Sequence, residues 1–357
     1  MNTRQPFAQI LYNGIDITKD VSDDLISLSY TDNAEGKSDD IQLVLDDTAG
    51  LWANGWYPLK GDQIQVILGY TDLSVTAGTF DIDEITISGT PAKINIKGIA
   101  TGTARALRTP KSFAHENKTL DEIARTVASA NSLTLQGEIT PIRIARATQN
   151  RETDLGFLKR ISREFGYLFS IRDNVMTFTS MYDIDARTPV VSVDITQTTR
   201  YSFTDKLVGT YSGATATYHN VDTRETVAVT GTRSENIDGQ EVTDGTSGDT
   251  IEIRTKAENV QQAEAKTKAA LYRANTEGQT GNISLEGNPL LLSGNNLELT
   301  GFGQLSGKYQ IVSSGHNISP SGYTTDIEVK RIAYISVSKY TPAVEQSQAR
   351  EIKPREV

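Results

Sequence analysis

The chain has 357 residues, of which 37% are hydrophobic, and a formal net charge of −10. This length exceeds one ordinary core and predicts two or three domains. The lack of cysteine excludes disulfides and thiolate chemistry, and the acidic balance argues against tight binding to nucleic-acid phosphates, which requires clustered Lys and Arg.

No segment has the roughly 20 consecutive apolar residues that a membrane helix needs. The first residues, Met1–Pro6, also lack the apolar core of a secretory signal. We therefore expect synthesis in the cytoplasm and no stable membrane insertion.

The N-terminal part has the alternating pattern of β-strands. The dipeptide Asn13-Gly14 lies between two apolar runs, which is the strongest short signal of a hairpin. Further strands are predicted at residues 25–30 and 41–45. We expect a β-domain over residues 1–104.

Two tryptophans, Trp52 and Trp56, lie in the connection that follows these strands. Exposed tryptophans bind sugars or protein partners in some proteins. Core packing or anchoring of the loop is the more common role, and we expect it here.

Residues 105–200 have a different pattern, which predicts an α+β domain. Thr119 and Glu122 form a capping box at the start of a predicted helix. Its apolar residues recur at helical spacing: Leu120, Ile123, Ala124, Val127 and Ala128.

A second helix is predicted from about Asp154 to a glycine cap at Gly166. Its expected buried residues are Leu155, Leu158, Ile161 and Phe165. A hairpin of two strands follows over residues 167–178.

Residues 201–335 are predicted to form a second β-domain. Strands are expected at 207–211 and 214–218, an exposed loop or hairpin tip at 231–250, and an Ala-rich helix at 256–274. The remaining residues, 336–357, are polar and charged. Alone, such a tail is disordered or weakly helical, so we expect a partner surface to order it.

Two segments resemble copies of one module: Gly61–Ala100 and Gly294–Ala333. Each opens with Gly-Asp or Gly-Asn and an alternating strand. Each continues with a Gly-x-aromatic-x-Ile step and closes with an alternating strand that ends in Ile-Ala. Alternating strands with glycine turns also resemble one another by composition alone. A duplication is the more informative interpretation, because three chains with two modules each present six similar units.

The residue types that carry catalysis or bind metals are sparse. The histidines His115, His219 and His316 have no metal-binding spacing, so a zinc site is not expected. The acidic segments Asp20–Asp24 and Asp81–Glu84 are expected to be solvated rather than to form a glycosidase or calcium site.

The run Ser313-Ser314-Gly315-His316 suggests a nucleophilic serine. Neighbouring residues of a strand point to opposite faces, so we expect no Ser–His pair there. The glycines form neither a Walker loop nor a dinucleotide-binding motif. We expect no enzyme activity, no catalytic, cofactor-binding or metal site, and no cofactor.

Two longer stretches, residues 150–167 and 263–331, resemble the phage late control gene D proteins, which are tail baseplate hubs. The second stretch contains Gly307-Lys308-Tyr309 and Gly315-His316-Asn317-Ile318-Ser319. The family is also similar to the hub portion of type VI secretion spikes. The resemblance implies that Gly307, Tyr309 and His316 serve folding, with His316 a hydrogen-bonded structural histidine.

The resemblance implies a mainly β chain in which two tube-like β-barrel domains flank a small α+β domain. Three chains would form a pseudo-sixfold trimer between the sixfold tail tube and the trimeric spike of a contractile injection system. Implied partners are the tail tube and spike proteins, with tape-measure and baseplate proteins as further contacts. DNA would pass only transiently through a channel that we expect acidic residues to line. The expected location is the baseplate of a virion tail or injection particle, assembled in the host bacterial cytoplasm.

The chain ends soon after the second module. We therefore expect any spike needle or lysozyme domain to be a separate protein. Two other functions stay open from the residues alone: a tail protein that binds glycans on the host surface, and a peptidoglycan hydrolase.

Overall fold

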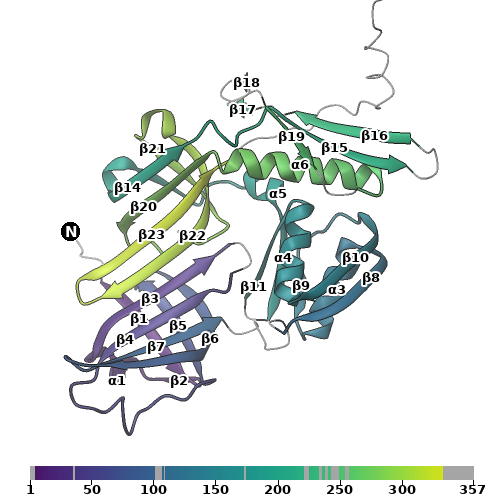
Figure 1. Cartoon of the computed structure of the whole chain (residues 1–357). Helices are drawn as coiled ribbons and strands as arrows, with labels where there is room; N and C mark the ends of the chain where they lie inside the picture. Colours follow the sequence, from purple (N-terminus) through teal and green to yellow (C-terminus); the bar gives the residue numbers. More distant parts are fainter. Residues whose placement is uncertain are drawn as a thin grey trace, which may run out of the picture.

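The computed structural model describes residues 5–34, 37–100, 107, 109–172, 174–220, 225–232, 235–237, 240–242, 249–253 and 257–332. The predicted tail, 336–357, lies outside these residues. As predicted, the protein is mainly β with few helices. Figure 1 shows two β-modules, one above the other, and a mixed α/β region beside them.

The first module follows the predicted β pattern. Its elements are β1 (Pro6–Tyr12), β2 (Ile15–Asp16), α1 (Thr18–Ser22), β3 (Leu25–Asn33), β4 (Asp40–Asp46), β5 (Gln63–Tyr70), β6 (Leu73–Ser88) and β7 (Lys93–Ala100). The predicted hairpin is confirmed, because Tyr12 pairs with Ile15 around Asn13-Gly14, both of which have positive φ.

The second module is assembled from two separate parts of the chain. Its elements are β13 (Val191–Asp194), η1 (Ile195–Gln197), β14 (Thr198–Asp205), β20 (Gln279–Glu286), β21 (Asn296–Thr300), η2 (Gly303–Leu305), β22 (Gly307–Ser319) and β23 (Gly322–Arg331). Its core contains fully buried Leu297, Tyr309 and Val329.

The two modules have the same strand order, which confirms the predicted duplication. The order is β3-β4-β7-β6-β5-β1 in the first module and β14-β20-β23-β22-β21-β13 in the second. They differ in the last pair, because β1 is antiparallel to β5 whereas β13 is parallel to β21.

The hydrogen bonds match residue by residue. Ile82 exchanges backbone bonds with Gly61 and Asp62, and Ile311 does so with Gly294 and Asn295. Both modules carry a bulge directly after this isoleucine and another near the start of the first paired strand. Such bulges alter the local twist of a sheet, so the modules share these irregularities as well as their strand order.

One detail of the predicted correspondence between the segments Gly61–Ala100 and Gly294–Ala333 was wrong. It placed Ala333, outside the described residues, opposite Ala100. In the structure Phe80 pairs with Ala100 and the equivalent Tyr309 pairs with Arg331, so the closing strands align two residues earlier. A shift of two residues preserves the alternation of faces, and the apolar pattern alone therefore did not reveal it.

The mixed region contains the predicted helices and hairpin. Its elements are β8 (Lys111–Thr119), α3 (Leu120–Ala130), β9 (Thr134–Gln136), β10 (Arg143–Glu152), α4 (Asp154–Glu164), β11 (Tyr167–Arg172), β12 (Val175–Ser180) and α5 (Met181–Ala186). The capping box of Thr119 and Glu122 is present, and all five predicted apolar residues of α3 are buried. In α4, Leu155 is only partly buried while Phe157 is fully buried.

The chain then forms a three-stranded sheet, β16-β15-β19, packed on a helix, and a separate two-stranded sheet, β17-β18. The elements are β15 (Gly213–Asn220), β16 (Glu225–Thr232), β17 (Glu235–Ile237), β18 (Gln240–Val242), β19 (Thr250–Ile253) and α6 (Val260–Thr276). α6 begins at its cap, Asn259, later than predicted. The strand predicted at 207–211 is wrong: Leu207 and Val208 are exposed in a turn that continues through Gly209 with φ +93°.

Candidate functional site: the junction between the two modules

One strand pairing joins the modules into a continuous sheet of 13 strands. Residues Ser313–Ile318 of β22 lie antiparallel to Leu28–Asn33 of β3. The other edge of β22 pairs with β23 of its own module. β22 of the second module therefore also pairs with a strand of the first module. We call this pairing the junction, and it fixes how one module is placed against the other.

His316 is at the centre of the junction and is fully buried. Its Nε2 lies 2.8 Å from the hydroxyl of Ser314, and its Nδ1 lies 2.6 Å from that of Tyr323. Its ring stacks on Tyr30 of the first module at 5.9 Å. Burial lowers the pKa of His316 to about 4, although the charge of Asp32 opposes this shift. His316 is thus the structural, hydrogen-bonded histidine that was predicted.

The expectation that no serine pairs with His316 was wrong. It considered only adjacent residues, whereas Ser314 and His316 are two positions apart and share one face of the strand. Both side chains have zero exposure. A substrate cannot reach a buried hydroxyl at this position, so the hydrogen bond, which lies within β22, holds the His316 ring in its place at the junction.

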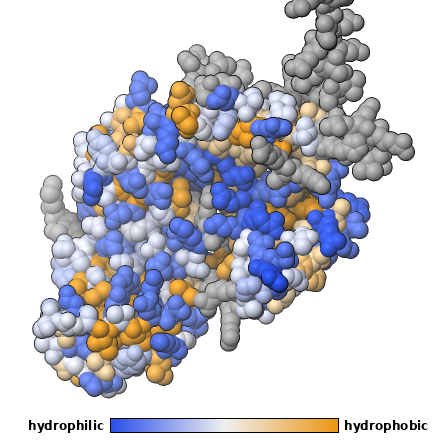
Figure 2. All heavy atoms as spheres, viewed as in Figure 1, coloured by the Kyte–Doolittle hydropathy of each residue, from blue (hydrophilic) through white to orange (hydrophobic). Residues whose placement is uncertain are grey.

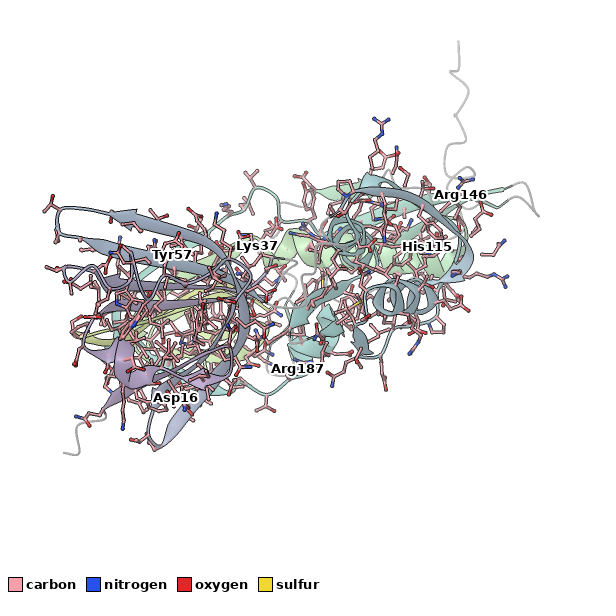
Figure 3. All side chains as sticks on the ribbon, turned by 90° about the horizontal axis from the view of Figure 1, so that it is seen from below. Asp16, Lys37, Tyr57, His115, Arg146 and Arg187 are labelled. Carbon is pink, nitrogen blue, oxygen red and sulfur yellow. The ribbon has the colours of Figure 1, made fainter. Side chains whose placement is uncertain are left out.

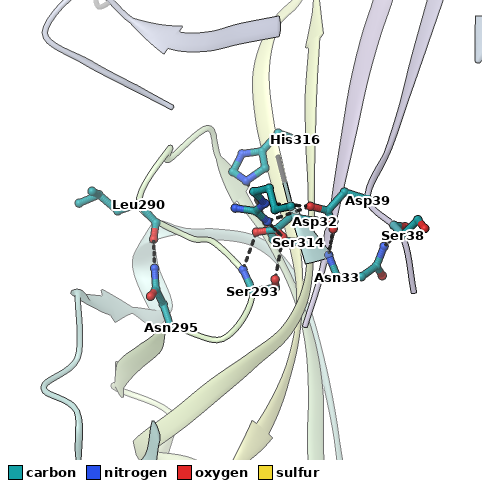
Figure 4. A network of polar contacts seen from close by, with 10 residues as sticks. Asp32, Asn33, Ser38, Asp39, Leu290, Ser293, Asn295, Ser314 and His316 are labelled. Carbon is teal, nitrogen blue, oxygen red and sulfur yellow. Dashed lines mark hydrogen bonds and ion pairs between the residues drawn. The ribbon is translucent and has the colours of Figure 1, made fainter. Parts of the chain in front are cut away.

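An ionic cluster extends the junction to the mixed region (Figure 4). Asp32, fully buried, accepts hydrogen bonds from the backbone N–H and the hydroxyl of Ser293, at 2.8 and 2.7 Å. Arg172, at the end of β11, forms ion pairs with Asp32 and with Asp39. Its Nη2 and Nε lie 2.9 and 3.1 Å from the Asp39 carboxylate. Both modules and the mixed region therefore meet at the carboxylate of Asp32.

The two carboxylates have different surroundings. Burial, and then the charge of Asp32, raise the pKa of Asp39 to about 6, while Arg172 acts in the opposite direction. No local pattern in the sequence marks this cluster, because Asp32 and Arg172 are 140 residues apart. A charged residue in register with buried strand positions, as Asp32 is with Leu28 and Tyr30, is the one available hint.

The other candidate residues do not come together. His115 is buried in the mixed region, where its ring stacks on Phe157 at 5.4 Å, and burial lowers its pKa. Figure 3 shows it far from Asp16 and Tyr57 of the first module. The side chain of His219 is outside the described part. Within the described residues, no cluster of three or more potential metal ligands occurs.

The tryptophans anchor the connection between β4 and β5. Trp52 is 7% exposed, and its indole N–H donates to Asp24 at 2.9 Å. Trp56 packs edge-on against Trp52 but is half exposed, as is Tyr57. Figure 2 shows apolar surface gathered over the lower part of the first module. The anchoring role is confirmed for Trp52, whereas Trp56 packs on Trp52 and leaves apolar surface exposed.

Replacing His316 by glutamine is expected to reduce the dependence of stability on pH. The native state keeps His316 neutral to about pH 4, whereas the unfolded chain binds its proton near pH 6.5. The unfolded state therefore binds more protons between these values, and stability falls as the pH drops through this window. The histidine accounts for about 2 kcal/mol of lost stability between pH 7 and pH 5. Urea titrations of both proteins at the two pH values measure this difference. An equal loss in wild type and variant would contradict it.

Comparison with known proteins identifies the family of this chain. The sequence model of the phage tail baseplate hub (GPD) family matches residues 103–322. The chain belongs to this family. Among the described residues, no helix has the length and hydrophobicity needed to cross a membrane.

Two probable baseplate hub proteins are similar in sequence. That of Escherichia phage 186 is 28% identical over 218 residues, which is 59% of this chain and 55% of that protein. That of Escherichia phage P2 is 25% identical over 222 residues, which is 60% of this chain and 57% of that protein. The similarity thus spans just over half of each relative.

Solved structures extend the likeness to nearly the whole fold. The tail protein from Neisseria meningitidis MC58 has a TM-score of 0.66 at 12% identity, covering 92% of this chain and 97% of its own. An Escherichia coli component of the type VI secretion system, described as similar to the phage T4 tail proteins gp27 and gp5, has a TM-score of 0.53 at 13% identity. This match covers 90% of this chain and 76% of that one. At these identities the likeness establishes a shared fold.

Proposed function

We propose that this protein is a structural hub in the baseplate of a phage tail or related contractile injection system. It would join the sixfold tail tube to the threefold spike. The observation that carries this proposal is the matched strand order and register of the two modules within one chain. Three copies then present six equivalent modules, which is what a contact between threefold and sixfold rings requires.

In this proposal each module is one tube-like, barrel-forming unit of the ring. The domains are residues 1–104, 105–200 and 201–335, followed by the tail 336–357. β13 lies before residue 200 and β14 includes it, yet both pair within the second module, so the strands of that module begin before residue 201. The mixed region braces the ring from outside, held to it by Arg172 and its two aspartates.

The proposed partners follow from this position. They are two further copies of the chain, the tail tube protein and the trimeric spike, with tape-measure and baseplate proteins as neighbours. DNA passes through the ring without stable binding. Assembly takes place in the cytoplasm of the host bacterium, and the role is structural rather than catalytic.

The absolute mass of the purified protein tests the proposal. Light scattering is expected to give the mass of three protomers, each of 39.0 kDa, for the chain alone or mixed with the spike protein of the same particle. A monomer or a dimer under both conditions would overturn the symmetry-adaptor role.

A further inference from the structure

The two modules of one chain are joined at one place, where a strand edge of the second module pairs with a strand edge of the first. Because the modules are equivalent, each should have both kinds of edge. The second half of β22 pairs with β3. In the first module, the second half of β6 is equivalent to this part of β22. In the second module, the edge of β14 that faces away from β20 is equivalent to the edge of β3 that pairs with β22. Within the described residues, neither of these edges has a strand opposite it.

We propose that residues Glu84–Ser88 of β6 pair antiparallel with residues Ser202–Lys206 of β14 in a second copy of the chain. The register is that of the junction between β22 and β3. This inference rests on the proposed ring and names the surfaces that close it. We call this pairing the seam.

The register of the seam follows from the paired residues. Ile82 corresponds to Ile311, so Glu84 and Ile87 correspond to Ser313 and His316. The pairings of β3 with β4 and of β14 with β20 make Tyr30 equivalent to Phe203 and Asn33 equivalent to Lys206. Transferring the pairs of the junction gives these opposed residues in the seam: Glu84 with Lys206, Ile85 with Asp205, Thr86 with Thr204, Ile87 with Phe203, and Ser88 with Ser202.

The exposed fractions of equivalent residues show which apolar side chains are buried at the junction but exposed at the free edges. At the junction, His316 is 0% and Leu28 is 1% exposed. Their counterparts at the free edges, Ile87 and Tyr201, are each 49% exposed. Apolar side chains left open at these two edges are what a missing neighbouring module explains.

Four of the five opposed pairs have complementary residue types, and the fifth places Ile85 against Asp205. Glu84 faces Lys206 with opposite charge, and Ile87 faces Phe203 as an apolar pair. Both kinds of cross-strand pair stabilise antiparallel sheets. Two further pairs, Thr86 with Thr204 and Ser88 with Ser202, place hydroxyls opposite each other. An unpaired strand edge also invites association, and a seam in this register satisfies both edges at once.

A loop beside the first edge supports the same neighbour. Leu292 and Leu59 occupy equivalent positions, each two residues before the paired glycines Gly294 and Gly61. Leu292 packs against the core of the first module, whereas Leu59 is 63% exposed. In the seam Leu59 packs on the second module of the adjoining copy. Because the two edges differ, the contact runs head to tail and closes a ring.

A cysteine pair tests the seam directly, because the chain has no native cysteine. The double variant Thr86→Cys, Thr204→Cys is oxidised at the concentration that gives the trimer, alone or with the spike protein. Opposed residues of antiparallel strands lie within disulfide range, so crosslinked dimers and trimers are expected on non-reducing gels. The matched control Thr86→Cys, Thr199→Cys places the second thiol five residues from that register and is expected to give no crosslink.

The possible outcomes distinguish a failure of the proposed seam from a failure of the proposed trimeric ring. A trimer by light scattering without crosslinks overturns the seam and leaves the proposed hub intact. A crosslinked open chain of protomers without a trimer supports the seam and overturns the ring. Neither trimer nor crosslinks under both conditions overturns both.

A charge exchange gives an independent readout of the register. Glu84→Lys or Lys206→Glu alone places like charges opposite each other and is expected to weaken association roughly fivefold for each seam. The double variant Glu84→Lys, Lys206→Glu is expected to restore association. Equal weakening by all three variants would contradict the proposed register.

Discussion

Replacement of Arg172 by methionine is expected to lower the free energy of unfolding by about 3 kcal/mol. The guanidinium pairs with Asp32, which is fully buried, and with Asp39, which is 4% exposed. Without it, two carboxylates stay in the interior next to each other with no cation. Removing one partner of a buried ion pair costs more than the pair contributes, because the remaining charge lacks both water and a counter-charge. Urea denaturation at pH 7 measures the effect.

Two further variants serve as a control and as a rescue for this prediction. Arg125→Met removes an exposed arginine that pairs with Asp121 on the surface of α3 and is expected to change stability by less than about 0.5 kcal/mol. Asp32→Asn with Asp39→Asn in the Arg172→Met background removes the uncompensated charges and is expected to recover part of the loss. If Arg172→Met behaves like Arg125→Met, the ionic cluster does not hold the mixed region to the modules.

Replacement of Tyr30 by alanine is expected to cost about 4 kcal/mol. The Tyr30 side chain has zero exposure and lies between the two modules. It stacks on His316 and meets the edge of Phe80 at a centroid distance of 5.9 Å. Its loss opens a cavity in the buried part of the junction, so the destabilisation includes a cavity contribution as well as lost apolar burial. Thermal and urea unfolding of the isolated protomer measure the change.

Phe203→Ala is a matched control, because the two modules are equivalent. Phe203 occupies the position of Tyr30 in the second module but is only partly buried in one chain. We expect a smaller loss of about 2 kcal/mol in the protomer. Phe203→Ala should in addition weaken the trimer, in which Phe203 becomes a seam residue. Equal losses for the two variants would show that the junction is no better packed than the free edge.

Much of the local structure was determined by the sequence itself. The Asn13-Gly14 hairpin and the helices α3 and α4 formed where turn chemistry, capping and periodicity predicted them. These elements depend on interactions within a few residues, which a sequence displays directly. The duplication was also visible, because each copy repeats the spacing of its glycines and apolar residues.

Other features were decided only by the tertiary structure. β8 and β10 have polar sequences and pair through partners that local pattern does not identify. Residues 207–211 have strand-like composition, yet Leu207 and Val208 are exposed, and no strand among the described residues pairs with them. Strand pairing depends on the neighbour that the fold supplies, so β propensity alone does not determine it.

The functional site shows the same division. The role of His316 was predicted from the family resemblance, but its bond to Ser314 and its stacking on Tyr30 depend on the register of β22 against β3. Residues that meet there, such as Ser29 and Asn317, are 288 positions apart in the chain. The sequence by itself determined that there are two similar modules. The tertiary structure decided which of their edges meet and which stay open, because edge pairing is a long-range choice of partner and register.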